Sequence, residues 1–358
     1  MMKTFEEVFS ATPTVIASAP RRVNLLGEHT DYNGGYVMPT AIPQHTSVSI
    51  RLNKRNTFRL YSAALDQLAE FDLSNSPSEH FATYIFGCLR EVQDLRVHIS
   101  ALDIHISSDV PMGVGLSSSA ALEVAMLRAL RKLLNLNLSD VTIAKMAQQA
   151  EIKYTKVNCG IMDQMAASLA NTKHLLFLDT RALETQLLPL PTHSEILVLD
   201  SGFSRNLAKS KYNERRLECA AAAKLLKVNE LRDAMDLSAI EKLAKPLNRR
   251  ARHVFHENNR VLHARKGVSA IKFGQLMNAS HLSLMQDYEV SIPELDLLVS
   301  LLQQNDEVFG AKLTGAGFGG ACVALCSENS AMSIGQEVLK EYNKVGKQGQ
   351  LIIPIIKD

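Results

Sequence analysis

A run of glycines and serines, PMGVGLSSSA at residues 111–120, is the feature that most constrains how this chain folds. Residues 101–106 before it alternate between apolar and polar side chains, which is typical of a β-strand, and residues 120–134 after it carry apolar side chains at helical spacing. Glycines allow the backbone to approach a ligand closely, and the first turn of a helix presents unpaired N–H groups. The run therefore predicts a strand, an anion-binding loop and a helix, with phosphate as the anion.

The run differs from the loop of the common P-loop proteins, because the pattern GxxxxGK[ST] is absent and no lysine follows the glycines. A glycine turn with a serine helix cap would account for the same residues, since serine favours the N-cap position. The density of glycine and serine favours phosphate binding over that alternative.

A second glycine cluster, at residues 315–320, formally matches GxGxxG. The residues that follow it, ACVALC, resemble a strand and not a helix, so a dinucleotide-binding fold is not expected. The cluster is either a turn between two strands or a backbone that packs closely on the first loop or on a nucleotide.

A polar segment near the N-terminus, residues 21–36, places Arg22, Glu28, His29 and Asp31 around one glycine. These side chains offer several hydrogen-bond acceptors and donors, which suits a ligand with many hydroxyl groups, such as a sugar. A metal site at His29 is not favoured, because no second histidine lies at ligand spacing. A surface turn would explain the Asp-Tyr-Asn-Gly-Gly portion but not the charged residues before it.

Two acidic residues form a third candidate group. Glu151 lies near the end of an expected helix, and Asp163 lies in the loop CGIMDQ at residues 159–164. Asp163 would accept a proton from a hydroxyl or hold that hydroxyl in place. Glu151 would bind Mg²⁺, a cation that prefers oxygen ligands. Taken alone, each carboxylate is more often a helix cap or a solvated side chain.

The remaining sequence predicts a mixture of strands and helices in two domains, since 358 residues exceed one typical core. The domain change is expected between about 170 and 200. A net charge of +2 argues against a dedicated nucleic-acid binder. Strands are expected at 47–52, 101–106, 174–178, 196–200, 322–325 and 351–356, and helices at 120–134, 140–154 and 213–227.

The cysteines and the apolar residues bear on the compartment of the protein. Five cysteines without a CxxC pair predict free thiols, which fit a reducing cytosol better than a disulfide framework or a zinc ribbon. The N-terminus lacks the pattern of a signal peptide. No apolar run reaches the roughly 18–20 residues that cross a bilayer. We therefore expect a cytoplasmic protein.

Together these segments resemble the GHMP kinase superfamily, and within it the galactokinase family, over nearly the whole chain. The matching stretches are RVNLLGEHTDYNGGYVMPTAI at 22–42, PMGVGLSSSAALEVA at 111–125, CGIMDQ at 159–164, LAKSKYNERRLEC at 207–219 and GAKLTGAGFGGAC at 310–322. The resemblance implies an α+β, two-domain GHMP kinase fold, with domains at 1–180 and 181–358 and the active site in the cleft between them. It implies ATP-dependent phosphorylation of galactose at the anomeric hydroxyl, giving galactose 1-phosphate and ADP.

The resemblance also implies roles for individual residues. Asp163 is the base for the anomeric hydroxyl, and Arg22 stabilises the transferring phosphoryl group. Ser119 and Glu151 are the Mg²⁺ ligands. The sugar-binding residues are Glu28, His29, Thr30, Asp31, Gly160 and Tyr212. The nucleotide loop comprises Gly113, Val114, Gly115, Leu116, Ser117, Ser118 and Ser119, with Ser62 as a further ATP contact.

Two residues depart from the family pattern, because Arg21 and Lys156 stand where the family commonly has glycine. Arg21 would either shift Arg22 or point to solvent. Lys156 would end its helix differently, since glycine suits a left-handed helix end.

Two other functions stay open at this point. One is a related GHMP kinase that acts on arabinose, N-acetylgalactosamine or another polyol. The other is a non-catalytic sensor that is built on the kinase fold and binds galactose and ATP. Sensors of this kind are shortened in the Ser-Ser-Ser-Ala loop, whereas residues 117–121 are complete here. The expected partners are the sugar and ATP, without nucleic acid or membrane, and the chain is expected to be a monomer.

Overall fold

The computed structural model describes residues 3–109, 116–203 and 208–355. Gly113, Val114 and Gly115, which the resemblance assigns to the nucleotide loop, lie outside the described residues. The chain divides into two compact units. Unit 1 comprises Met1–Arg22, Ala41–Met112 and Ser117–Ala170, and unit 2 comprises Val23–Thr40, Gly113–Leu116 and Asn171–Asp358. The family domains expected at 1–180 and 181–358 stay a prediction.

Unit 1 is built on a five-stranded sheet in the order β1-β3-β6-β4-β5. Strand β3 runs antiparallel to β6, whereas β4 runs parallel to β6, so the sheet is mixed. The expected strands at 47–52 and 101–106 are confirmed, as parts of β3 and β6. The strands are β1 (Val15–Asn24), β3 (Pro39–Leu52), β4 (Phe58–Ser62), β5 (Gln67–Phe71) and β6 (Leu102–Ser108).

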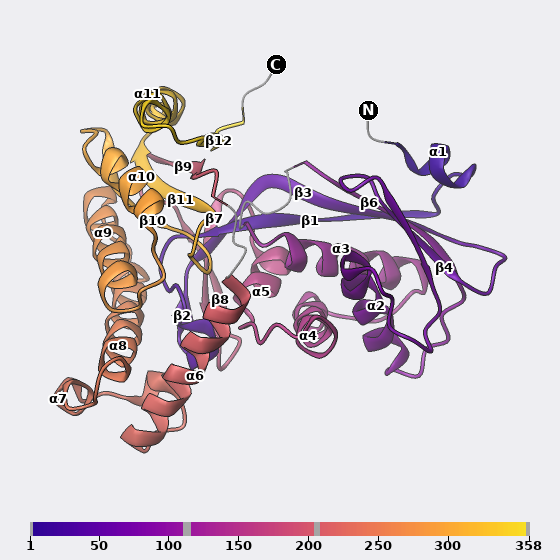
Figure 1. Cartoon of the computed structure of the whole chain (residues 1–358), viewed down its shortest axis with the longest axis horizontal. Coiled ribbons are helices and arrows are strands. Elements are labelled where there is room, and N and C mark those ends of the chain that lie inside the picture. Colours follow the sequence, from indigo (N-terminus) through magenta and orange to yellow (C-terminus); the bar gives the residue numbers. More distant parts are fainter. Residues whose placement is uncertain (1–2, 110–115, 204–207, 356–358) are drawn as a thin grey trace. The chain divides into compact units, whose positions relative to one another are not determined.

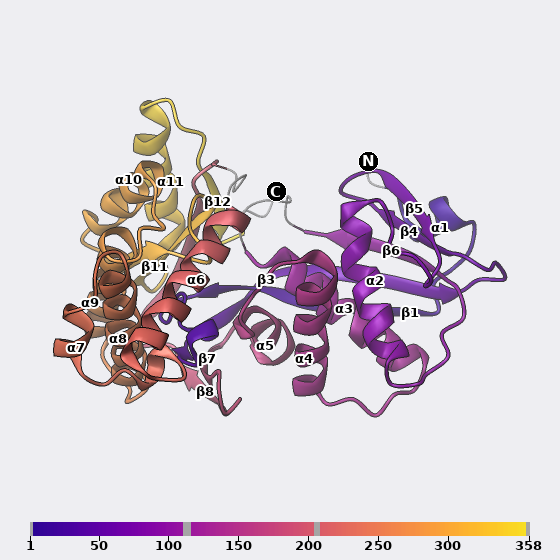
Figure 2. The ribbon, with the colours of Figure 1, turned by 60° about the horizontal axis from the view of Figure 1, so that its bottom comes forward.

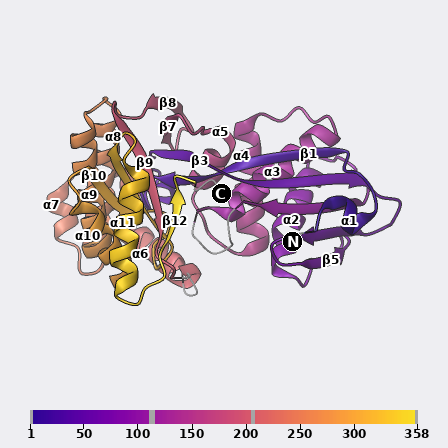
Figure 3. The same cartoon turned by 90° about the horizontal axis from the view of Figure 1, so that it is seen from above.

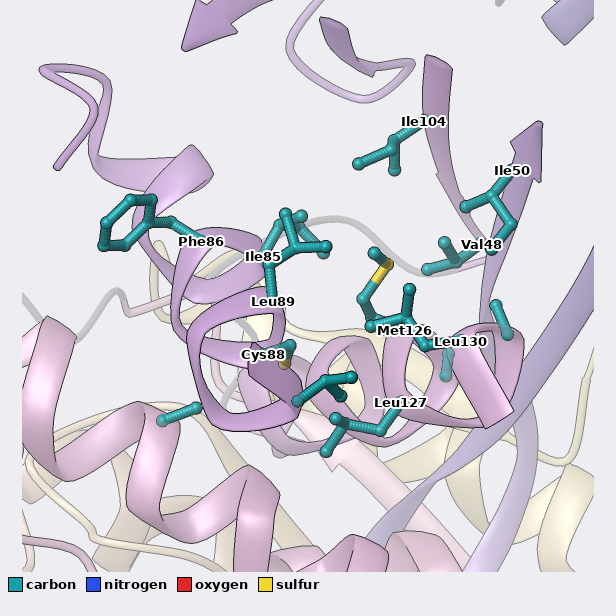
Figure 4. Close-up of a cluster of buried hydrophobic side chains, with 14 of the residues drawn as sticks. Val48, Ile50, Ile85, Phe86, Cys88, Leu89, Ile104, Met126, Leu127 and Leu130 are labelled. Atoms are coloured by element: carbon teal, nitrogen blue, oxygen red, sulfur yellow. The ribbon is translucent and has the colours of Figure 1, made fainter. Parts of the chain in front are cut away.

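Four helices of unit 1 lie on one face of this sheet (Figure 1). They are α2 (His80–Gln93), α3 (Ser118–Leu133), α4 (Asp140–Ala150) and α5 (Met162–Leu169), and the short α1 (Phe5–Phe9) precedes β1. The sheet and the helices share one apolar core, in which side chains of β3, β6, α2 and α3 point toward one another (Figure 4). Its fully buried members include Val48, Ile50, Ile85, Leu89, Ile104, Met126, Leu127 and Leu130.

The ends of α4 show how the sequence sets local structure in unit 1. Ser139 caps the helix, since its side chain accepts a hydrogen bond from the Thr142 N–H, as expected for serine at an N-cap. After Ala150 the chain continues as a π-helical turn, η2 (Glu151–Thr155). Lys156 then adopts the left-handed conformation, with φ 60° and ψ 32°. The expectation that Lys156 ends the helix differently from glycine is therefore wrong. The left-handed conformation costs a non-glycine residue such as Lys156 about 1 kcal/mol.

Unit 2 contains two antiparallel sheets. The larger has the order β10-β11-β9-β12, and the smaller has the order β2-β7-β8. The strands expected at 174–178, 196–200 and 322–325 are confirmed as parts of β7, β9 and β11. The strands are β2 (Tyr36–Val37), β7 (His174–Asp179), β8 (Thr185–Pro189), β9 (Ser194–Asp200), β10 (Val308–Leu313), β11 (Ala321–Ser327) and β12 (Gln350–Ile353).

The helices of unit 2 pack against the larger sheet and against one another. Helix α9 contacts β10 and also lies beside α8 (Figure 2), and α11 contacts β9 and β12 (Figure 3). The close approach of α9 to β10 requires glycine on both sides, because a Cβ atom at Gly274 would lie 2.0 Å from the Phe309 oxygen and one at Gly310 would lie 2.1 Å from the Gly274 oxygen. The helices are α6 (Ala208–Leu226), α7 (Leu237–Glu241), α8 (Leu247–Ala264), α9 (Ala270–Gln286), α10 (Pro293–Gln303) and α11 (Ala331–Lys344), with the 3₁₀ turns η1 (Asp31–Asn33) and η3 (Leu231–Asp233).

Two sequence expectations about the whole chain can be compared with this fold. All five cysteines lie in the described part of the chain and are free thiols. Within the described residues, none of the helices combines the length and the apolar character that a membrane crossing needs.

Candidate active site

The candidate catalytic pair of unit 1 is an ion pair between Arg22 on β1 and Asp163 in the first turn of α5. The Arg22 Nε and Nη2 atoms lie 2.7 Å and 2.6 Å from Asp163 Oδ1. The Arg22 side chain is 4% exposed and the Asp163 side chain is 32% exposed, so solvent reaches the carboxylate but not the guanidinium. The structure thus brings together the two residues to which the sequence assigned the chemistry.

The second oxygen of Asp163 accepts a hydrogen bond from a serine of the predicted phosphate loop. Ser117 Oγ lies 2.5 Å from Asp163 Oδ2. Ser117 is the N-cap residue of α3 and adopts a left-handed conformation, with φ 52° and ψ 51°. Asp163 therefore holds a cation on one oxygen and a hydroxyl group on the other.

The three successive serines each contact a different charged side chain. Besides the Ser117 contact, Arg21 Nη2 donates to Ser118 Oγ at 3.0 Å, and Ser119 is hydrogen-bonded to the Glu151 carboxyl. The start of α3 thus contacts charged side chains from three other elements, β1, η2 and α5. A serine that served only as a helix cap would not need these contacts. The serine run is consequently a centre of polar contacts in unit 1.

Arg21 is buried, at 1% exposure, so the alternative that it points to solvent is wrong. Its Nη2 atom also donates to Ser108 Oγ at 2.8 Å. Burial lowers the pKa of Arg21 to about 10, partly opposed by the Asp109 carboxylate. Arg22 keeps its pairing with Asp163 beside this second guanidinium.

Glu151 begins the π-helical turn η2 and is buried. Burial raises its pKa to about 7, a shift that the Ser119 hydrogen bond opposes and the Asp163 charge reinforces. Gln164 Nε2 donates to Glu151 Oε2 at 2.7 Å. The carboxyl group is therefore held in a fixed orientation beside the serine run.

Glu123 on α3 is a member of this group that the sequence analysis did not identify. It is fully buried, and burial together with the neighbouring Glu151 carboxyl raises its pKa well above the usual range. A signal was present in the sequence, because Glu123 follows Ser119 by four residues and thus shares its face of the helix.

The oxygen atoms of this group fit a hard cation. Ser119 supplies a hydroxyl and Glu151 supplies a carboxylate, and Mg²⁺ takes few protein ligands beside phosphate and water oxygens. No cluster of three or more histidine, cysteine, aspartate or glutamate side chains suited to a metal ion occurs among the described residues. The residues present thus suit a shared metal site and not an all-protein cage.

The other unit 1 residues with expected roles are placed as follows. Ser62 is the last residue of β4, is buried, and pairs with Ile106 of β6. Gly160 is buried in the loop before α5. Both residues belong to unit 1, as do Arg22 and Asp163.

In unit 2, the predicted sugar segment follows directly after β1. Glu28 is 1% exposed, and its Oε1 accepts a hydrogen bond from the Gly315 N–H at 2.5 Å and lies 3.5 Å from Lys312 Nζ. Its Oε2 accepts a hydrogen bond from Asn24 Nδ2. The second glycine cluster therefore binds the Glu28 carboxylate through its backbone, a contact that the sequence did not reveal.

His29 is also buried, at 4% exposure, and has a left-handed backbone with φ 62°. Its Nδ1 lies 2.8 Å from Tyr32 Oη, and its Nε2 lies 3.3 Å from the Ala316 oxygen. Burial lowers its pKa to about 3, with a smaller contribution from His253, so the imidazole is neutral near pH 7.

The remaining residues assigned to the sugar differ in how deeply their side chains are buried. Thr30 is buried, and its hydroxyl oxygen lies 2.8 Å and 2.7 Å from the carbonyl oxygens of Gly27 and Tyr36, either of which can accept its hydrogen. Asp31 is half-buried at the start of η1. Tyr212 on α6 is half-buried, and its ring centre lies 5.6 Å from that of His29. Asp31 and Tyr212 are thus the most accessible side chains of this group.

Glu257 on α8 supports the same segment and was missed in the sequence. It is fully buried, and its Oε1 accepts hydrogen bonds from the Gly27 and Glu28 N–H groups at 2.7 Å and 3.3 Å. Arg260 Nε lies 2.6 Å from its Oε2. Although burial opposes ionisation, this arginine and other nearby charges lower the pKa of Glu257 to about 2. Nothing in the helical pattern around Glu257 marked it as a partner for a loop more than 200 residues earlier.

Comparison with known proteins places this geometry in a family. Three family models match the chain: the galactokinase galactose-binding signature over residues 3–52, the GHMP kinases N terminal domain over residues 83–171, and the GHMP kinases C terminal model over residues 267–344.

Curated relatives match over nearly the full length. The galactokinase of Roseiflexus sp. (strain RS-1) is 40% identical over 356 residues, covering 96% of this chain and 91% of the relative. The galactokinase of Chloroflexus aurantiacus is 42% identical over 335 residues, covering 90% and 86%.

Solved structures agree with the sequence relatives. Lactococcus lactis galactokinase complexed with galactose superimposes with a TM-score of 0.89 and 33% identity, covering 97% of this chain and 95% of that one. A mevalonate kinase, at 22% identity and a TM-score of 0.69, shares the fold. The α+β GHMP kinase fold expected from the sequence is confirmed, and the chain belongs to the galactokinase family of GHMP kinases.

Proposed function

We propose that the chain transfers the γ-phosphoryl group of ATP to the anomeric hydroxyl of galactose, giving galactose 1-phosphate and ADP. The observation that carries this proposal is the Arg22–Asp163–Ser117 arrangement, in which one carboxylate holds an arginine and a hydroxyl group at the start of α3. Family membership supports galactose as the acceptor, because relatives of about 40% identity are named galactokinase and one solved relative is complexed with galactose.

Asp163 has the properties of a base for a hydroxyl group. Arg22 donates to Oδ1 through Nε and Nη2, while Oδ2 already accepts a hydroxyl hydrogen bond from Ser117 at 2.5 Å. In the proposed reaction the anomeric hydroxyl takes the place of Ser117 on Oδ2, and its proton passes to that oxygen as the phosphoryl group is transferred.

Arg22 has the properties of a residue that stabilises the phosphoryl group. Its Nε and Nη2 atoms are used by Asp163, while its buried Nη1 finds no hydrogen-bond partner among the residues that the structure describes. A guanidinium carries five N–H donors in a fixed plane, so Nη1 is available to a phosphoryl oxygen while the other side of the fork stays on Asp163. Phosphoryl transfer depends mainly on such positioning and charge neutralisation.

The nucleotide and its metal ion are assigned to the serine run. Ser117, Ser118 and Ser119 are proposed to contact the phosphates, together with residues 113–116 and Ser62, and Ser119 and Glu151 are proposed to hold Mg²⁺. When bound, Mg²⁺ supplies charge neutralisation on the phosphate oxygens. The first turn of α3 adds its unpaired N–H groups to this site.

The sugar is assigned to the segment of Glu28, His29, Thr30 and Asp31, with Tyr212 and Gly160. Asp31 and Tyr212 are half-buried and offer a carboxylate and a phenol to sugar hydroxyls. A cytoplasmic location, a monomeric state and an active site in a cleft between domains stay predictions from the sequence.

A substrate panel tests this proposal. The purified chain is incubated with ATP, Mg²⁺ and galactose, arabinose, N-acetylgalactosamine or glucose, and ADP release is measured with and without each sugar. We expect galactose-dependent ADP release and a product whose ³¹P–¹H coupling places phosphate on the anomeric carbon. ADP release that prefers another sugar would identify a related kinase. Binding of galactose and ATP without ADP release would identify a non-catalytic sensor.

A further inference from the structure

The turn that carries Asp31 in unit 2 is held by side chains that lie far along the chain. Asp31 begins η1, and Gly34 ends it with a left-handed φ of 65°. Three backbone carbonyl groups of this turn are acceptors for two later side chains, which are at least 145 residues away. The acceptors are the oxygens of Asp31, Gly34 and Gly35, and the donors are the side chains of Thr180 and Arg232.

Thr180 contacts the first and the last of these carbonyl groups. It follows β7 directly and is buried. Its N–H donates to the Gly35 oxygen at 3.0 Å. Its hydroxyl oxygen lies 3.1 Å from the Asp31 oxygen and 2.9 Å from the Gly35 oxygen, so its one hydrogen can go to either carbonyl. Thr180 thus links both ends of the turn to the end of β7.

Arg232 in η3 contacts the middle of the same turn. Its Nη1 donates to the Gly34 oxygen at 2.9 Å, and its Nη2 donates to Tyr36 Oη at 2.6 Å. The guanidinium is itself fixed, because the same two nitrogen atoms lie 2.6 Å and 2.8 Å from the two carboxylate oxygens of Asp179. Its central carbon also lies 4.3 Å from the centre of the Tyr36 ring. Such paired contacts need the planar fork of arginine, which lysine lacks.

Two neighbouring glycines make this turn dependent on contacts from outside it. Glycine restricts its backbone less than any other residue, so Gly34 and Gly35 do not by themselves select one conformation. A larger residue is not accommodated at Gly35, since a Cβ atom there would lie 2.4 Å from Asn258 Oδ1. The conformation of the turn, and with it the position of the Asp31 side chain, is therefore set by the two donors and by the residues packed around the glycines.

We infer that Thr180 and Arg232 are positioning residues for sugar binding, because they fix the backbone of the turn that carries Asp31. The inference rests on the proposed function of Asp31 in binding galactose. It adds two residues that act on the sugar site through the backbone of the turn. A binding group has to be held within about 0.5 Å of its productive position, and the hydrogen bonds to the turn provide this precision.

Removal of one hydroxyl group tests the inference. Thr180→Val keeps the shape of the side chain and removes only the donor, so the galactose KM and the galactose Kd should rise about fivefold, as expected for the loss of one hydrogen bond. The kcat and the ATP KM should stay within about twofold of wild type, because the turn affects the binding of the sugar and not the transfer step. Thr180→Ser, which keeps the hydroxyl group, should restore the galactose KM. A Thr180→Ser variant as impaired as Thr180→Val would overturn the inference, because the methyl group would then account for the loss.

The matched control is Thr40→Val. Thr40 is also buried in unit 2, and its hydroxyl oxygen lies 3.2 Å and 2.9 Å from the carbonyl oxygens of Asn171 and His174. Both variants should lower the midpoint of denaturant unfolding by a similar amount, whereas only Thr180→Val should raise the galactose KM. Equal galactose KM values for wild type and both variants would overturn the role of Thr180. Equal increases in both variants would do so too, because they would reflect a general loss of stability.

Arg232→Lys tests the second donor. Lysine keeps the charge but cannot reach the carboxylate and the turn at once, so the galactose KM should rise about tenfold while kcat stays within about twofold of wild type. Arg252→Lys is the control, because Arg252 makes similar paired contacts with Glu241 and Asp287, and its galactose KM should not change. A wild-type galactose KM in Arg232→Lys would contradict the role of Arg232.

Hydrogen exchange separates this inference from the proposed function. Backbone amide exchange over residues 31–36, measured by mass spectrometry without any sugar, should be about fivefold faster in Thr180→Val than in wild type and unchanged in Thr40→Val. The same exchange rate in all three proteins would overturn the inference. If the wild-type protein neither binds nor phosphorylates galactose, the proposed function fails, and the exchange rates still decide whether Thr180 fixes the turn.

Discussion

The polar residues of unit 1 and those of unit 2 are organised in opposite ways. In unit 1 the Asp163 carboxylate is about one third exposed, and its partners are a guanidinium and a serine hydroxyl that substrate groups can replace. In unit 2 Glu28, His29 and Glu257 are buried, and their polar atoms are occupied by backbone groups and neighbouring side chains. The difference suggests that unit 1 carries groups that exchange partners during a reaction, whereas unit 2 carries groups that hold a binding segment still.

The largest effect on activity is expected from removing the charge of the Arg22 guanidinium in unit 1. Arg22→Gln should lower kcat about 10³-fold, roughly 4 kcal/mol of transition-state stabilisation, because it removes the guanidinium assigned to the transferring phosphoryl group. Steady-state kinetics with galactose and ATP would measure this loss.

Unit 1 offers a matched control for this substitution. Arg59 on β4 bonds Asp103 Oδ1 through Nε and Nη2, both at 2.7 Å, in the same geometry as Arg22 and Asp163. Arg59→Gln should leave kcat within about twofold of wild type, since Arg59 lies outside the proposed site. A similar loss of kcat in both variants would mean that the Arg22 pair only stabilises the fold.

The next effect concerns the stability of unit 2. Glu257→Gln should lower the free energy of unfolding by about 3 kcal/mol, because Arg260 loses its partner and the Gly27 and Glu28 N–H groups lose a charged acceptor. Denaturant unfolding would measure the change. Glu241→Gln, which removes an exposed pair with Arg252, should cost less than about 1 kcal/mol. Equal costs for the two variants would contradict the support assigned to Glu257.

The buried histidines of unit 2 predict a pH dependence of stability. Burial lowers the pKa of His29 to about 3 and that of His253 to about 4, below the usual value of 6.5. The unfolded chain therefore binds more protons below pH 6.5, and the free energy of unfolding falls as pH decreases. Between pH 7 and pH 5 each histidine should account for a loss of about 2 kcal/mol.

Unfolding at several pH values checks this prediction. A His29→Gln variant should lose less stability than wild type on acidification, because it has one fewer buried histidine. His193→Gln should behave as wild type, since His193 is almost fully exposed. A pH dependence that is the same in all three proteins would contradict a neutral, buried His29.

The smallest effect is expected at the end of η2. Lys156→Gly should change the free energy of unfolding by less than about 1 kcal/mol, because relief of the left-handed backbone is offset by the greater freedom of glycine in the unfolded chain. Asn135→Gly is the control, since Asn135 has φ 50° and asparagine tolerates this conformation. A loss of several kcal/mol at Lys156 would show that its side chain has a structural role.

The same contrast explains which parts of the fold and of the candidate site could be predicted from the sequence. Periodicity located β3, β6, β7, β9 and β11 and the helices α3, α4 and α6. The glycine–serine run, Arg22 and Asp163 were identified because the proposed catalytic groups stand in short motifs of unusual composition. The supporting groups were missed. Glu257 stands in an ordinary helical pattern, and only folding brings it to a segment more than 200 residues away.

Backbone conformation set a second limit. Lysine at 156 and arginine at 21 replace glycines of the family pattern, and the sequence predicted an altered backbone at both positions. The sequence gives the conformation that a residue type prefers, but not the conformation that its folded surroundings impose. Lys156 adopts the left-handed conformation, and Arg21 is buried on Ser108 and Ser118 without displacing Arg22 from Asp163.

The most direct measurement separates chemistry from sugar binding at a single residue. Asp163→Asn keeps the shape of the side chain but removes the base, so kcat should fall about 10³-fold or more while the galactose Kd, measured by calorimetry, stays within about threefold of wild type. Near-normal kcat in Asp163→Asn would contradict the assignment of the reaction to the Arg22–Asp163 pair, and so would a loss of galactose binding that matches the loss of kcat.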